Sequence, residues 1–146
     1  MRVAKSFSVS PEEHNRIGGK LRVLLAEEPA ILITYLYGSF VAGTGFNDID
    51  LAVLIDEARF KDERELFEYQ LALTVRLERE LRPFPVDLIV LNRAPLPHRF
   101  RVVSEGAFLL SKDEQQRIEF ENRTRVLFFD FLPHLEFYYE KLVLGR

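Results

Sequence analysis

The fold of this chain is decided by residues 31–55, which read ILITYLYGSFVAGTGFNDIDLAVLI. The first part, Ile31 to Tyr37, is a nearly continuous apolar run that is rich in β-branched and aromatic residues and follows Pro29. Such a run predicts a buried strand rather than a helix. Gly38-Ser39 then predicts a turn, and Asp48 to Ile55 predicts a second strand that begins with two acids.

Helices and one more strand are predicted on either side of this stretch. Ser10-Pro11-Glu12-Glu13 has the residues of a helix start, because Ser can cap the helix and Pro suits its first position. The remaining predictions are a helix to about Glu28, a helix over Phe60 to Leu81, a strand over Val86 to Leu91, a short helix over Arg101 to Glu105 and a long helix over Asp113 to Leu144, bent at Pro133. This order predicts an α/β (or α+β) fold in which a small mixed sheet is flanked by helices.

Length and composition narrow the classes of protein that this chain can belong to. With 146 residues, 47% hydrophobic and 29% charged, we expect one compact domain over residues 1–146. The absence of Cys excludes disulfides and thiolate chemistry, and a net charge of −3 argues against direct nucleic-acid binding by charge. No apolar run is long enough for a membrane span or a signal peptide, so we expect a cytoplasmic protein with no membrane contact.

Three acids are the candidate metal ligands. Side chains alternate along a strand, so Asp48 and Asp50 point to the same side, roughly 6 to 7 Å apart along the chain. If the third predicted strand lies beside theirs, Asp87 joins the cluster. Carboxylate oxygens of this kind suit Mg²⁺ or Mn²⁺.

Gly38 and Ser39 are the candidate phosphate-binding residues. Small residues in a turn after a strand allow backbone amides to approach an anion closely. Together with a carboxylate-bound metal, this turn predicts a site for a nucleoside triphosphate. Two other phosphate motifs are excluded, because Thr44 stands where a P-loop needs Lys and Asp48 stands where a dinucleotide fingerprint needs Gly.

The charged residues also have simpler interpretations. Acids at the start of a strand are commonly solvated turn residues, and Asp87 has an alternative as an edge-strand acid that faces water. We favour a functional site because an unpaired carboxylate inside a buried strand is costly, and because the acids occur together with Gly-Ser. Arg99 and Arg101 are best explained as residues of a solvated helix face.

The predicted C-terminal helix, residues 113–144, carries a wide apolar face. Its apolar residues cover an arc of roughly 160°, whereas packing against the protein's own sheet needs about 100°. These residues are Phe120, Leu127, Phe128, Phe131, Leu132, Leu135, Tyr138, Tyr139, Leu142 and Val143. The surplus predicts contact with a partner protein or with a second copy of the chain. The alternative is a bent helix that wraps around a small core.

The motifs resemble those of a known enzyme family. Tyr37-Gly38-Ser39-Phe40-Val41-Ala42-Gly43, Asp48-Ile49-Asp50-Leu51-Ala52-Val53-Leu54 and Val86-Asp87-Leu88-Ile89-Val90 resemble the minimal nucleotidyltransferases of the DNA polymerase β superfamily. The segment from Gly106 to Leu142 is similar to the MntA subgroup, the antitoxins of HEPN–MNT toxin–antitoxin pairs. Eight residues separate Ser39 from Asp48, two fewer than is usual in the family, and Asn47 stands where Ser is common.

The resemblance implies a reaction and a role for each candidate residue. It implies Mg²⁺-dependent transfer of AMP from ATP to a tyrosine of a HEPN-type toxin, with release of pyrophosphate. Gly38 and Ser39 would hold the β- and γ-phosphates, Asp48 and Asp50 would coordinate the metals, and Asp87 would ligate the second metal and help to deprotonate the acceptor hydroxyl. Two alternatives are a non-catalytic antitoxin that binds its toxin through the C-terminal helix, and a transferase for a small molecule such as an aminoglycoside.

Overall fold

A four-stranded sheet forms the centre of the molecule in the computed structural model, which describes residues 6–43, 45–143 and 145. The strands are β1 (Ile31–Tyr37), β2 (Ile49–Ile55), β3 (Val86–Val90) and β4 (Ala107–Ser111), in the spatial order β3-β2-β1-β4. Strand β2 pairs antiparallel with β1 and parallel with β3, and β4 pairs antiparallel with β1. The predicted mixed sheet is therefore confirmed, and β3 and β4 are its edges.

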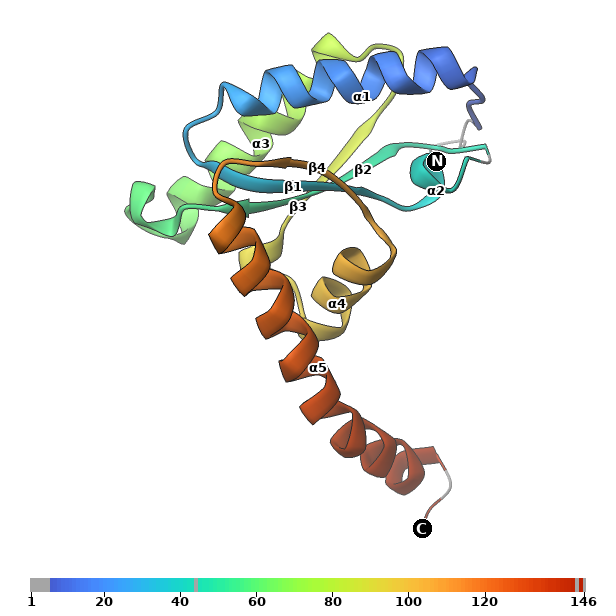
Figure 1. Cartoon of the computed structure of the whole chain (residues 1–146), viewed down its shortest axis with the longest axis vertical. Helices are drawn as coiled ribbons and strands as arrows, with labels where there is room; N and C mark the ends of the chain where they lie inside the picture. The colour runs from blue at the N-terminus through green and yellow to red at the C-terminus, as the bar shows by residue number, and fades with distance from the viewer. Residues whose placement is uncertain (1–5, 44, 144, 146) are drawn as a thin grey trace.

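Helices cover both faces of this sheet (Figure 1). They are α1 (Pro11–Ala26), α2 (Ser39–Ala42), α3 (Glu63–Glu80), α4 (Leu96–Glu105) and α5 (Glu114–Val143), with short 3-10 turns η1 (Glu57–Arg59) and η2 (Leu91–Arg93). In Figure 1, α1 and α3 lie over one face, while α4 and the beginning of α5 lie over the other. The predicted α/β class, with a small sheet flanked by helices and a long C-terminal helix, is confirmed.

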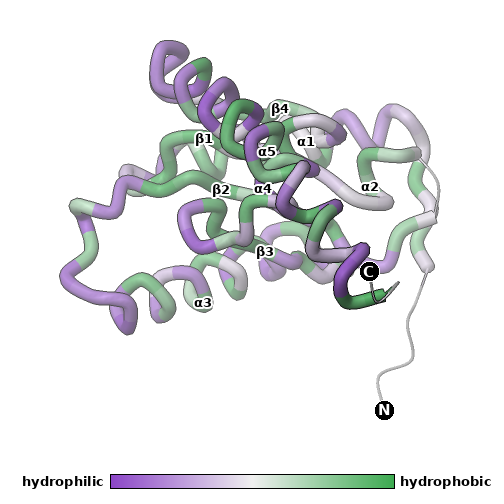
Figure 2. Tube along the Cα trace, turned by 90° about the horizontal axis from the view of Figure 1, so that it is seen from below, coloured by the Kyte–Doolittle hydropathy of each residue, from purple (hydrophilic) through white to green (hydrophobic). Residues whose placement is uncertain are grey.

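The two faces of the sheet build two separate hydrophobic clusters. Leu51 and Val53 of β2 point toward the cluster that contains the buried residues of α1 and α3. Their neighbours Ala52 and Leu54 point to the opposite side, where Val102 of α4 also packs. The tube in Figure 2 shows strands β1 and β2 mainly in the hydrophobic colour. This alternation means that Asp50, between Ile49 and Leu51, shares the α4 side of the sheet.

Several element boundaries differ from those predicted. Helix α3 begins at Glu63 rather than Phe60, because the Asp62 side chain caps it by accepting a hydrogen bond from the Glu65 amide at 2.9 Å. Helix α4 begins at Leu96, five residues before the predicted start, with Pro97 in its first turn. Proline has no amide hydrogen, but the amides of the first helical turn have no partner within the helix. Pro95 and Pro97 are therefore compatible with a helix that begins at Leu96.

Strand β4 was not predicted from the sequence. Its residues pair with Ile33 to Leu36 of β1, and only Leu109 of the strand is buried. A five-residue edge strand with one buried side chain has no clear alternating pattern, so its conformation depends on pairing with a distant segment. On its exposed side, the guanidinium carbon of Arg117 lies 4.7 Å from the centre of the Phe108 ring.

Helix α5 packs on the domain only along its first half. The Tyr35 hydroxyl of β1 donates a hydrogen bond to Glu121 Oε1 at 2.7 Å, and the rings of Phe128 and Phe100 stack with centroids 3.9 Å apart. From Pro133 to Val143 every residue is exposed, and Figure 1 shows this end projecting away from the sheet. Pro133 lies within the helix and does not end it. No helix of the described ranges has the length and apolar character needed to cross a membrane.

Candidate active site

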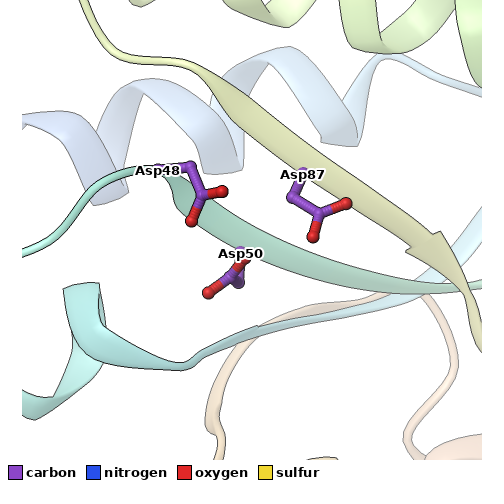
Figure 3. Close-up of side chains that lie close together, drawn as sticks. All are labelled: Asp48, Asp50 and Asp87. Atoms are coloured by element: carbon purple, nitrogen blue, oxygen red, sulfur yellow. The ribbon is translucent and has the colours of Figure 1, made fainter. Parts of the chain in front are cut away.

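Asp48, Asp50 and Asp87 come together at one end of the sheet (Figure 3). Asp48 immediately precedes β2, and Asp50 of β2 pairs directly with Asp87 of β3 in the parallel register. One carboxylate oxygen from each residue lies within 4.8 Å of the other two. Parallel pairing in this register puts paired residues on the same face, which explains why the acids meet on the α4 side.

The cluster carries more negative charge than its surroundings neutralise. Burial raises the pKa of the Asp50 carboxyl to about 7, and the charges of Asp48 and Asp87 and hydrogen bonds with them add to this effect. Within residues 6–43 and 45–143, no Lys or Arg forms an ion pair with any of the three acids. Three converging oxygen ligands with a charge deficit of this kind fit a divalent cation.

Asp87 is more exposed than the sequence predicts. The apolar run around Asp87 predicts a carboxylate inside a buried strand, but β3 is an edge strand and Asp87 is exposed. That expectation is wrong because an apolar run does not distinguish a central strand from an edge strand covered on one face. The desolvated carboxylate is Asp50, which lies in the second strand from the edge.

Gly38 lies against the acid cluster. Its φ of +77° is in the left-handed region, and a Cβ atom added to it would lie 2.2 Å from Asp50 Oδ2. Both the conformation and the close approach therefore require glycine at this position. Gly38 precedes α2, whose buried Phe40 stacks on the ring of His14 with centroids 4.1 Å apart. His14 Nε2 also donates a hydrogen bond to the Phe40 carbonyl at 2.8 Å, which ties α2 to α1.

A pocket of about 440 Å³ opens beside this turn. Gly38 and Ser39 line it together with Tyr37 of β1 and with Arg101 and Glu105 of α4. Burial raises the pKa of the Tyr37 hydroxyl, and the three nearby carboxylates raise it further, while the positive charge of Arg101 lowers it. The structure thus brings Arg101 to the candidate site, which sequence periodicity alone did not predict because α4 meets β1 only in the folded chain.

The raised pKa of Asp50 predicts a pH-dependent stability. Its pKa is about 7 in the folded protein and about 4 in the unfolded chain, so the folded state binds more protons between these values. The free energy of unfolding should therefore fall as the pH rises from 4 to 7. Asp50→Asn should remove this slope and stabilise the metal-free protein at pH 8 by about 1–2 kcal/mol, allowing for solvent screening.

Urea denaturation of the metal-free protein at pH 5 and pH 8 measures this effect. Asp130→Asn, which changes an exposed acid of α5, is the matched control and should keep the wild-type slope. An Asp50→Asn protein with the same pH dependence as the wild type would contradict the prediction.

Comparisons with known proteins agree with this geometry. The family model described as "Polymerase beta, Nucleotidyltransferase" matches residues 19–115, a range that includes all three acids and the Gly-Ser turn. No curated protein sequence matches the chain.

Solved structures of toxin–antitoxin complexes contain chains of similar fold. One is the structure of the tri-AMPylated Shewanella oneidensis HEPN toxin in complex with MNT antitoxin. Its matching chain is 25% identical, with a TM-score of 0.65, and the match covers 90% of this chain and 97% of that one. A structure of a toxin–antitoxin with AMP-PNP contains a chain that is 26% identical, with a TM-score of 0.61, and the match covers 88% of this chain and 96% of that one. The toxin–antitoxin MntA-HepT, with 24% identity, a TM-score of 0.64, and coverage of 90% and 97%, shows the shared fold.

Proposed function

Because the chain belongs to the polymerase beta nucleotidyltransferase family, we propose that it transfers AMP from ATP to a protein hydroxyl, specifically a tyrosine of a HEPN-type toxin. The observation that carries the proposal is the convergence of Asp48, Asp50 and Asp87 within 4.8 Å beside Gly38. A similar chain belongs to a complex of an MNT antitoxin with a tri-AMPylated HEPN toxin, which supports AMP as the transferred group. The chain would then act as the antitoxin of the pair.

Asp48, Asp50 and Asp87 would hold Mg²⁺ or Mn²⁺. The fit rests on their three converging oxygen ligands and on the raised pKa of Asp50, which reflects uncompensated negative charge. A divalent ion bound there supplies positive charge that stabilises the phosphate oxygens as negative charge develops on them. Metal binding requires Asp50 to be ionised, so we expect proton release on binding below pH 7.

The other residues of the site would bind the nucleotide and handle the proton. The backbone at Gly38 and the hydroxyl of Ser39 would hold the β- and γ-phosphates in the adjoining pocket. Asp87, exposed at the sheet edge, is accessible to an incoming hydroxyl group and would accept its proton. The hydroxyl oxygen then bonds to the α-phosphorus while the bond from that phosphorus to the bridging oxygen breaks, and pyrophosphate leaves with the electron pair.

Radiolabelled ATP tests this proposal. The purified chain is incubated with Mg²⁺ and ATP labelled at the α-phosphate in an extract of the cells in which the chain is naturally made. A parallel reaction uses ATP labelled at the γ-phosphate. We expect a labelled protein band from the α-label only, and mass spectrometry of that band should identify the modified tyrosine. Label from the γ-phosphate would indicate kinase activity, and a labelled small molecule in place of a protein would favour a small-molecule acceptor.

The projecting end of α5 supports a second role, direct binding to the toxin partner. Residues 133–143 are all exposed and project away from the sheet, and the exposed apolar residues Leu135, Tyr138, Tyr139, Leu142 and Val143 lie on one face of the helix. The most exposed members of this face are Tyr138 and Leu142, at 62% and 68%. Aromatic residues on an exposed helix are typical anchors of protein interfaces. The same surface could also pair two copies of the chain. Separate measurements of toxin binding and of self-association distinguish these two kinds of assembly.

Replacing Tyr138 and Leu142 with Ser should weaken the complex at least about 100-fold without unfolding the chain. Both side chains are exposed, so their loss removes partner contacts but no core packing. Glu136→Ser with Glu140→Ser is the matched control, because these residues lie on the opposite side of the same turns of α5. Calorimetric titration with the toxin and light scattering of the chain alone measure the two kinds of assembly. Unchanged assembly in both assays would contradict the assignment of this surface.

A further inference from the structure

Arg101 is the one Lys or Arg side chain, among the described residues, that lines the pocket beside Gly38 and Ser39. It lies on α4, and its Nε is 3.2 Å from Glu105 Oε2, one helical turn further along. Both side chains of this ion pair are about 70% exposed, at 71% and 70%. Arg101 therefore faces the candidate phosphate site from a helix that contributes no acid to the cluster.

Arg101 can neutralise negative charge that a bound nucleotide would bring into the pocket. Asp48, Asp50 and Asp87 meet beside Gly38, which also lines the pocket of about 440 Å³, so a nucleotide bound there would add further negative charge to that of the three carboxylates. A divalent ion on the acids compensates charge on that side only. An exposed ion pair contributes little to the free energy of folding. Arg101 can therefore exchange Glu105 for another anion with little loss of stability. A guanidinium group can bind a phosphate through two parallel hydrogen bonds, which makes phosphate the stronger partner.

We propose that Arg101 leaves Glu105 when nucleotide binds and holds the β- or γ-phosphate across the pocket from Gly38 and Ser39. This inference rests on the proposed function, because it concerns the nucleotide of that same reaction. Arg101 would keep the pyrophosphate portion in place while the α-phosphorus is attacked, and Glu105 would compete with the nucleotide for it. Arg99, two residues earlier on α4, does not line the pocket.

Isothermal titration calorimetry with three probes tests the inference in the presence of Mg²⁺. The probes are α,β-methylene-ATP, which cannot release AMP, AMP itself, and inorganic tripolyphosphate. We expect Arg101→Gln to weaken the binding of α,β-methylene-ATP and of tripolyphosphate by about tenfold or more and to leave the binding of AMP unchanged, because AMP has neither a β- nor a γ-phosphate. Arg101→Lys should recover part of the affinity, and Glu105→Gln should preserve or tighten the binding of both polyphosphates.

Arg64→Gln is the matched control. Arg64 forms the same kind of ion pair with Glu68 on α3, at 3.1 Å, and it does not line the pocket. Its loss should leave all three affinities unchanged.

Each outcome bears on one of the two proposals. Equal polyphosphate affinity in the wild type and Arg101→Gln would overturn the inference and leave the proposed function standing. Equal losses for AMP and α,β-methylene-ATP would also overturn it, because they would indicate a general effect on the fold. A wild-type chain that binds none of the probes would overturn the proposed function together with this inference.

Discussion

Replacing Asp48 and Asp50 together with Asn is expected to lower AMP transfer at least about 1,000-fold. Asn keeps the shape of the side chain but removes the negative charge, so two of the three converging oxygen ligands no longer attract a divalent ion. The folded state should not suffer, because the charge of Asp50 is already unfavourable there, as its raised pKa shows. The measurement is the rate of label transfer from α-labelled ATP to the acceptor protein.

The same double variant separates the enzymatic role from direct binding. If the chain neutralises its toxin by AMP transfer, the Asp48→Asn/Asp50→Asn variant should lose neutralisation in cells while still forming the complex through α5. If it neutralises by binding alone, neutralisation should persist. Asp130→Asn controls for the loss of an acid elsewhere and should retain wild-type transfer. Transfer by the double variant at a rate near that of the wild type would contradict the assignment of these acids.

Gly38→Ala is expected to reduce the rate of AMP transfer about 100-fold. The new methyl group would lie 2.2 Å from Asp50 Oδ2, so either the carboxylate or the phosphate-binding turn must move. A left-handed φ of +77° adds about 1 kcal/mol or more of backbone strain for any residue with a Cβ atom. The rate of label transfer and the free energy of unfolding should both be measured, because the two effects have different causes.

Gly43→Ala measures the effect of a Cβ atom at a positive φ without a steric clash. Gly43 has nearly the same φ, +79°, but a Cβ atom there would meet nothing within 4 Å. Gly43→Ala should lose about 1 kcal/mol of stability and keep its activity. Gly38→Ala should lose more of both, because Gly38 combines its φ with a ψ of −157°, whereas Gly43 has a ψ of 5°, and because only its methyl group meets Asp50. Equal activity losses would show that backbone strain in this segment, and not the approach of Gly38 to Asp50, limits the reaction.

The sequence by itself determined three of the four strands, the long helices and part of the site. The apolar runs at residues 31–37 and 86–91 predicted strands, and the two-residue period of a strand put Asp48 and Asp50 on one face. Ser10 capped the first helix as predicted, by accepting a hydrogen bond from the Glu13 amide at 3.1 Å. These properties depend on neighbours within a few positions, so they can be inferred without knowing how distant segments pair.

The tertiary structure decided what depends on contacts between distant segments. The parallel pairing of β2 with β3 brought Asp87 level with Asp50, and the edge position of β3 left Asp87 exposed. The packing of α4 on the far side of the sheet carried Arg101 to the pocket beside Gly38. Strand order, edge position and helix docking are set by the burial of the whole apolar surface, which no single stretch of sequence contains.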